Sequence, residues 1–188
     1  MENLKRFTSR YQELNDEELQ ALENLFQPVT IKKMDHMMVE GDWIRDIFFI
    51  NQGLFRSYYI KNGEEFTVGF FYAPLMFAEI FSIRKNEPTR LNLQALSEVD
   101  CYKANFQELE KLMKVYPRIK QVFFKLYEML FVYGKKRQLS FIYESSKQRY
   151  LQFEQEFPRM IQEIPLQYIA SYLGVKPETL SRIRKKVN

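Results

Sequence analysis

Residues 166–185 read LQYIASYLGVKPETLSRIRK. In the first half of this stretch, Leu166, Ile169, Ala170 and Leu173 follow the spacing i, i+3, i+4, i+7. Apolar residues at this spacing lie on one face of a helix, so the stretch predicts a short amphipathic helix.

The second half of the stretch predicts a tight turn and another helix. Gly174 directly follows the last apolar position, where helices often end with a residue in the left-handed conformation. Pro177 suits the first turn of a helix, and Glu178 complements its positive end. Together with the small residue Ala170, where the helices would cross, this pattern predicts a helix-turn-helix. We expect its second helix, about residues 177–186, to enter the major groove of DNA.

The outer face of this second helix offers side chains that can read bases. Glu178, Arg182 and Lys185 are spaced i, i+4, i+7. Arg182 can bond guanine O6 and N7, and Glu178 can accept from cytosine N4. We expect phosphate contacts from the flanking residues Lys176, Thr179, Ser181, Arg184 and Lys186. The alternative is a charged, solvated helix that closes a helical bundle.

Charge is unevenly distributed along the 188 residues. Residues 1–133 carry 17 basic and 19 acidic side chains, a net charge of −2, whereas residues 134–188 carry 11 and 5, a net charge of +6. A basic C-terminal region favours a nucleic acid as partner, and we expect double-stranded DNA.

The chain contains one cysteine, Cys101, and one histidine, His36. These counts exclude an intramolecular disulfide, an iron–sulfur cluster held by cysteines alone, a thiolate zinc site and any site with two imidazoles. We predict no metal and no cofactor. One histidine can ligate a haem, so a haem sensor remains an alternative, although His36 fits an ordinary strand residue better. No arrangement of nucleophile and base is evident, so we expect no enzyme.

The middle of the chain predicts a series of short antiparallel strands. The strongest signal is a hairpin from Phe55–Ile60 to Glu65–Phe70, joined through Asn62-Gly63. Further strands are expected at residues 47–50, 91–96 and 99–103. Six to eight strands of this kind suggest a roll or barrel.

Helices are predicted on both sides of the strands. Asn15 or Asp16 can cap a first short helix. Pro117 suits the start of a long one, and Ser145 with Gln148 forms a capping box for the next.

The long helix carries eleven apolar or aromatic residues between positions 119 and 133. Such a helix must be covered on every side, but a roll can cover only one face. We therefore predict a homodimer whose symmetry axis runs beside this helix. The residues expected at the interface are Val122, Phe123, Leu126, Met129, Leu130 and Tyr133. The alternative is a central helix enclosed in a monomeric core.

The first ten residues are polar and charged, without the apolar segment of a secretory signal. The most apolar stretch, residues 122–133, is interrupted by Lys125 and Glu128, so we predict no membrane span. We expect a cytoplasmic protein.

With the order strands, long helix and helix-turn-helix, the chain resembles the Crp/Fnr family of bacterial transcription regulators. The most specific match is Leu173-Gly174-Val175 with residues 178–182, ETLSR. The resemblance implies an α+β fold with an antiparallel, jelly-roll-like double-stranded β-roll similar to a cyclic-nucleotide-binding domain. It implies a sensor domain at residues 1–116, a dimerisation helix at 117–143 and a DNA-binding domain at 144–188. It also implies RNA polymerase and an unidentified small-molecule effector as partners.

The resemblance nominates Glu79, Thr89 and Arg90 for the effector pocket. Glu79 matches the family's phosphate-binding cassette, but the position of its arginine holds Thr89, and Arg90 comes one residue later. A shift of one residue on a strand changes the face, so we expect an effector other than cyclic AMP. After the second helix the family usually continues into a wing, and here residues 160–164 are the segment that could supply one.

Two other functions remain as alternatives. The chain could be an effector-binding or protein-interaction module with a vestigial helix-turn-helix. It could also be an enzyme on a cupin-like roll, although such sites usually hold a metal through several histidines.

Overall fold

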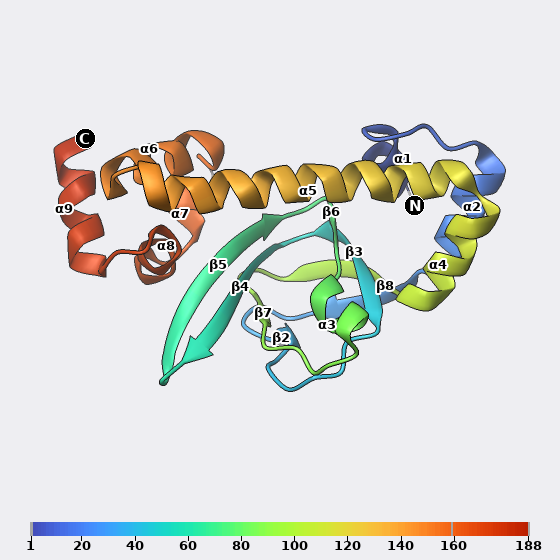
Figure 1. Ribbon diagram of the computed structural model, residues 1–188, viewed down its shortest axis with the longest axis horizontal. Coiled ribbons are helices and arrows are strands. Elements are labelled where there is room, and N and C mark those ends of the chain that lie inside the picture. Colours follow the sequence, from blue (N-terminus) through green and yellow to red (C-terminus); the bar gives the residue numbers. More distant parts are fainter. Residues whose placement is uncertain (1, 159, 188) are drawn as a thin grey trace. The chain divides into compact units, whose positions relative to one another are not determined.

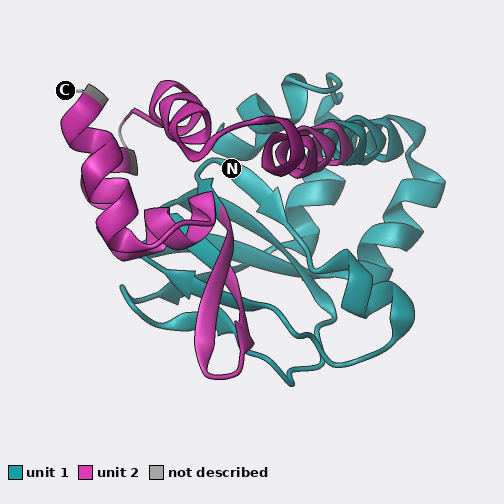
Figure 2. Ribbon diagram, turned by 60° about the vertical axis from the view of Figure 1, so that its left-hand side comes forward, with its two compact units in different colours: residues 1–57, 70–129 teal, residues 58–69, 130–188 magenta. Residues whose placement is uncertain are grey.

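The computed structural model describes residues 2–158 and 160–187, which form two units. The first unit comprises residues 1–57 and 70–129, and the second comprises residues 58–69 and 130–188, as coloured in Figure 2. Two elements, the β4–β5 hairpin and helix α5, contribute residues to both units.

The part of the chain up to α5 combines short helices with a set of antiparallel strands (Figure 1). The strands form two four-stranded sheets, in the orders β1-β8-β3-β6 and β2-β7-β4-β5. The predicted α+β fold with an antiparallel roll is therefore confirmed. The elements are α1 Glu2–Ser9, α2 Asp16–Leu25, β1 Gln27–Ile31, β2 His36–Met38, β3 Asp46–Gln52, β4 Leu54–Lys61, β5 Glu64–Tyr72, β6 Leu75–Phe77, α3 Ile80–Lys85, β7 Asn92–Ala95, β8 Val99–Asn105, α4 Phe106–Val115 and α5 Pro117–Tyr143.

Local sequence signals set several of these boundaries. Asn62 and Gly63 both have positive φ, 55° and 79°, as a two-residue type I′ hairpin requires, and the predicted hairpin is confirmed. Asn15 caps α2 in a capping box with Glu18. Helix α5 begins at Pro117 as predicted.

Strand β3 is buried on both faces. Ile47 and Phe49 belong to a core shared with helices α1, α2, α4 and α5. Phe48 and Ile50 point to the other face, into the interior of the roll, where Cys101 is also buried. Burial raises the pKa of the Cys101 thiol to about 11, as expected for a cysteine that acts as a small apolar core residue.

The first half of α5 packs into this unit. Ile119, Phe123 and Leu126 belong to the same core as Phe49, and Val122 is also buried. Of the six side chains predicted for a dimer interface, Val122, Phe123 and Leu126 are thus already covered within the chain, whereas Met129, Leu130 and Tyr133 are exposed.

In its described residues, the second unit contains four short helices after α5, drawn in orange and red in Figure 1. They are α6 Ser146–Glu156, α7 Met160–Glu163, α8 Leu166–Leu173 and α9 Pro177–Val187. The predicted capping box of Ser145 and Gln148 starts α6. The segment considered for a wing forms the short helix α7 and the residue after it.

Within the described residues, no helix has the length and apolar character that crossing a membrane requires. The same residues contain no group of three or more histidine, cysteine, aspartate or glutamate side chains placed to hold a metal ion.

Candidate nucleic-acid interface

Helices α8 and α9 are joined by the tight turn that the sequence predicts. Gly174 lies in the left-handed region, with φ 69° and ψ 36°. Its N–H donates to the carbonyls of Ala170 and Ser171, and the N–H of Val175 donates to Ala170. These bonds satisfy the last carbonyls of α8 and end the helix at a fixed angle.

Helix α9 presents the predicted base-reading residues to solvent. Leu180, on its inner side, is fully buried. Glu178, Arg182 and Lys185 are all exposed, on the opposite side of the helix. Arg182 Nη2 donates to the hydroxyl of Thr179, one turn earlier, at 3.3 Å.

The five predicted phosphate-binding residues differ in exposure. Lys176 and Lys186 are exposed, whereas Thr179, Ser181 and Arg184 are half-buried. Arg184 lies close enough to Tyr150 of α6 to affect its ionisation. Burial still dominates and raises the pKa of the Tyr150 hydroxyl, which donates to Glu154.

Two arginines hold the C-terminal end of α8, and the sequence analysis did not identify them. Arg137 Nη2 donates to the carbonyl of Tyr172 at 2.8 Å. Arg149 donates to the carbonyl of Leu173 through Nε at 3.2 Å and Nη2 at 3.0 Å. Cations suit the negative end of a helix. The signal that could have pointed to Arg137 is the basic run Lys135-Lys136-Arg137 inside an apolar helix.

Aromatic rings surround the same arginines. The Arg137 guanidinium lies 3.6 Å from the ring centroid of Tyr172 and 5.0 Å from that of Phe141. Burial lowers the pKa of Arg137 from its ordinary value, although the side chains of Tyr172 and Tyr133 favour its charged form.

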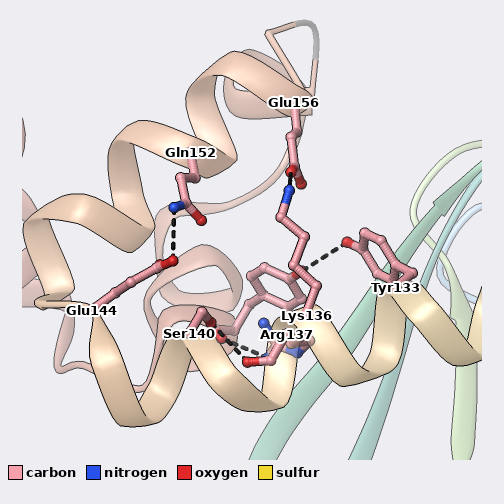
Figure 3. A network of polar contacts seen from close by, with 8 residues as sticks. Tyr133, Lys136, Arg137, Ser140, Glu144, Gln152 and Glu156 are labelled. Carbon is pink, nitrogen blue, oxygen red and sulfur yellow. Dashed lines mark hydrogen bonds and ion pairs between the residues drawn. The ribbon is translucent and has the colours of Figure 1, made fainter.

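A network of polar contacts connects α5, α6 and α8 around a cavity of about 40 Å³ (Figure 3). Lys136 forms an ion pair with Glu156 at 2.7 Å, and Gln152 donates to Glu144 at 2.8 Å. The hydroxyls of Tyr133 and Tyr172 lie 3.1 Å apart. Burial raises the pKa of the Tyr133 hydroxyl. A cavity of this size holds a water molecule or two, not an effector.

The first residues of β5 contact α8 through the hydroxyl of Ser171. Ser171 Oγ accepts from the N–H of Thr67 at 2.9 Å and donates to the carbonyl of Glu65 at 3.0 Å. The hydroxyl thus serves as both donor and acceptor for the edge of β5.

The three residues nominated for an effector pocket have different environments. Glu79 caps α3 by accepting from the N–H of Ser82 at 2.7 Å. Thr89 is buried, and its hydroxyl accepts from the N–H of Leu91. Arg90 is exposed.

A different arginine occupies the interior of the roll, and the sequence analysis missed it. Arg56, on β4, is 1% exposed, and its Nε and Nη2 both donate to Gln94 Oε1 on β7, at 3.1 and 2.9 Å. Asn92 and Thr89 are further buried polar residues of this unit. The sequence signal for this site was Arg56 itself, a charged residue within the predicted strand Phe55–Ile60.

Comparison with known proteins agrees with this architecture. Residues 28–116 match the model of the cyclic nucleotide-binding domain family. No curated protein matches the chain.

Several solved structures share the fold over most of the chain. FixK2 from Bradyrhizobium japonicum is 17% identical, with a TM-score of 0.75, and the match covers 86% of this chain and 84% of FixK2. The c-di-GMP responsive global regulator CLP of Xanthomonas campestris is 11% identical, with a TM-score of 0.76, over 92% of this chain and 91% of CLP. CooA from Carboxydothermus hydrogenoformans is 15% identical, with a TM-score of 0.71, over 88% of this chain and 77% of CooA.

At these identities the structures show a shared fold, and they are regulators of the family that the sequence resembles. Residues 28–116 are similar to the cyclic nucleotide-binding domain family, and the chain has the fold of the Crp/Fnr transcription regulators.

Proposed function

We propose that the protein is a cytoplasmic, dimeric transcription regulator that binds specific DNA sequences through α9. The observation that carries this proposal is the exposed face of Glu178, Arg182 and Lys185 on the helix that follows the Gly174 turn. A helix placed in this way can enter the major groove, where arginine and glutamate distinguish base pairs.

Electrostatics supports the same proposal. Helix α9 carries Arg184, Lys185 and Lys186 in its last turn, and the turn before it carries the exposed Lys176. Cations on one short helix attract the phosphate backbone of DNA of any sequence. Base contacts by Arg182 and Glu178 would then add sequence preference.

Dimerisation would use the exposed face of α5. Phe124 and Phe131 are seven residues apart, as are Val132 and Leu139, and all four are exposed. Apolar residues repeated every seven positions form the seam between two parallel or antiparallel helices. A groove of about 380 Å³ also follows the second half of α5, lined by Phe131, Val132, Leu139 and Tyr143 among others. We assign a second copy of this chain as its occupant.

The environment of the roll supports an effector other than cyclic AMP. Glu79 already serves as the cap of α3, and Arg90 is exposed. The buried cation of the roll is instead Arg56, on another strand. These residues favour an anionic or polar small molecule that differs in shape from cyclic AMP.

Selection of bound DNA from a random pool tests the proposed function. The purified full chain is expected to enrich two half-sites related by two-fold symmetry, with centres about 34 Å apart, one helical turn of DNA. Repeating the selection with candidate effectors would show whether one changes affinity. Failure to enrich any sequence at low salt would contradict the proposal and favour a protein-interaction module.

A further inference from the structure

Three side chains hold the turn of the helix-turn-helix against the last turns of α5. A Cβ atom added at Gly174 would lie 2.8 Å from Cε1 of Phe141, so the turn rests directly on this ring. The guanidinium groups of Arg137 and Arg149 lie 5.0 and 4.7 Å from the centroid of the same ring. We call Arg137, Phe141 and Arg149 the turn clamp.

The bonds of the turn clamp are directional. Arg137 donates to the carbonyl of Tyr172, and Arg149 donates twice to the carbonyl of Leu173, the last residue of α8. A planar guanidinium that stacks on a ring while it donates to a carbonyl can adopt few orientations. The clamp therefore fixes both the position and the direction of the end of α8, from which the Gly174 turn leads into α9.

The corner between α5 and α6 is closed by one member of the clamp, Arg149. Helix α5 ends at Tyr143, and Ser145 already caps α6. Between them, Arg149 Nη1 donates to the carbonyl of Glu144 at 2.6 Å. The last turns of α5 are thus joined to the helix-turn-helix by a short, bonded corner and not by a flexible linker.

We propose that Arg137 and Phe141, with Arg149, are positioning residues for sequence-specific DNA recognition. They set the orientation of α9 relative to the last turns of α5, and so the placement of the two recognition helices in a dimer formed through α5. This inference rests on the proposed function. Specific binding needs both helices in adjacent major grooves at once, whereas attraction to phosphates does not.

Variants of the full chain test this role by comparing two DNA ligands at one salt concentration, the selected operator and a random duplex. Phe141→Ala and Arg137→Lys are expected to lower affinity for the operator at least tenfold and to change affinity for random DNA less than twofold. Arg137→Lys keeps the positive charge but loses the planar fork that reaches the Tyr172 carbonyl. Phe141→Tyr, which keeps the ring, is expected to behave as the unaltered protein.

The matched control is Gln138→Ala, at an exposed position next to Arg137. Its affinity for both ligands should stay within twofold of the unaltered protein. Equal losses on operator and random DNA in Phe141→Ala and Arg137→Lys, or no loss on either, would overturn the positioning role.

A second measurement does not depend on DNA. Hydrogen exchange at the amides of residues 173–175 should be faster in Phe141→Ala and Arg137→Lys than in Gln138→Ala. If the unaltered protein enriches no DNA sequence, the proposed function fails, and exchange alone decides whether the clamp positions the turn. Unchanged exchange in both variants would then reject the clamp.

Discussion

The two halves of α5 differ in that the first has a buried face, whereas none of the buried residues of α5 lies in the second. In residues 117–129, Phe123 is 1% exposed and belongs to the core of the first unit. In residues 130–143, Phe131 is 74% exposed. Both halves are rich in apolar residues, so composition does not separate them; the neighbours that cover each half do. The first half supports the fold of the roll, and the second half offers apolar area to another molecule.

The largest expected effect concerns the buried half. Phe123→Ala should lower the free energy of unfolding by about 3–5 kcal/mol, because it leaves a cavity in a closely packed core. Urea denaturation at several protein concentrations measures it. The loss should be independent of concentration, whereas the smaller loss from Phe131→Ala should vary with concentration if that ring packs in a dimer. Equal, concentration-independent losses would remove the distinction between the halves.

The exposed half is tested by its association. Phe131→Glu should weaken the dimer about 100-fold, or about 2.7 kcal/mol, because a carboxylate would be buried at the seam. Sedimentation velocity measures the dissociation constant, and circular dichroism checks that the helices remain. Gln107→Glu adds the same charge at an exposed position of α4 and should leave the dimer intact. An unchanged dimer in Phe131→Glu would contradict the assignment of this face.

The exposed side chains of α9 are expected to affect binding to DNA but not stability. Arg182→Ala should cost about 1–3 kcal/mol on the selected operator and relax the preference at one base pair, and Lys186→Ala should weaken binding to all sequences about equally. Competition binding with operator and random DNA separates the two effects. If Arg182→Ala weakens binding to operator and random DNA equally, Arg182 contacts phosphate and not a base.

The turn between α8 and α9 should respond to a single methyl group. Gly174→Ala should destabilise the second unit by about 1–2 kcal/mol from its positive φ alone, with a further loss from the contact with Phe141. In the double variant with Phe141→Ala, the stability lost through the contact with the ring should be recovered, whereas the stability lost through the positive φ should not. Thermal unfolding of the two single variants and the double variant measures this coupling. Strict additivity would show that the ring does not touch the turn.

The smallest expected effect is at the hairpin. Ser171→Ala removes the hydroxyl that bonds Thr67 and Glu65, and should cost about 0.5–1.5 kcal/mol. Exchange of the Thr67 amide should become faster, while the hairpin turn at Asn62-Gly63 keeps its protection. Ser171→Thr keeps the hydroxyl and serves as the control. No change in Thr67 exchange in Ser171→Ala would show that this bond does not hold the hairpin.

Local chemistry explains which elements the sequence could predict. Asn62-Gly63 needs positive φ at both positions, and Gly174 with Pro177 ends one helix and starts the next, so these signals hold whatever surrounds them. Helix α1 was not predicted because its two buried apolar residues, Leu4 and Phe7, stand among charged and polar ones.

The faces of α5 could not be assigned from the sequence, because apolar residues on every side leave no periodicity to follow. The sequence therefore predicts Val122, Phe123 and Leu126 at a dimer interface, whereas all three are buried within the chain. The turn clamp was missed for a related reason. It joins residues 137, 141, 149 and 174, and only the folded chain brings them together.

The engagement of Arg137 and Arg149 has a consequence for how binding should depend on salt. Both count toward the positive charge of the C-terminal region, yet their guanidinium groups bond the carbonyls of α8, and Lys136 pairs with Glu156. The exposed cations of the turn and of α9 are Lys176, Arg182, Lys185 and Lys186. If each of these cations displaced one counterion from DNA, a dimer would release about eight counterions. A plot of the logarithm of affinity against the logarithm of salt concentration would then have a slope of about −7. Of the region's eleven basic residues, three thus serve to hold the helices of the second unit together, and these three should not contribute to the salt dependence.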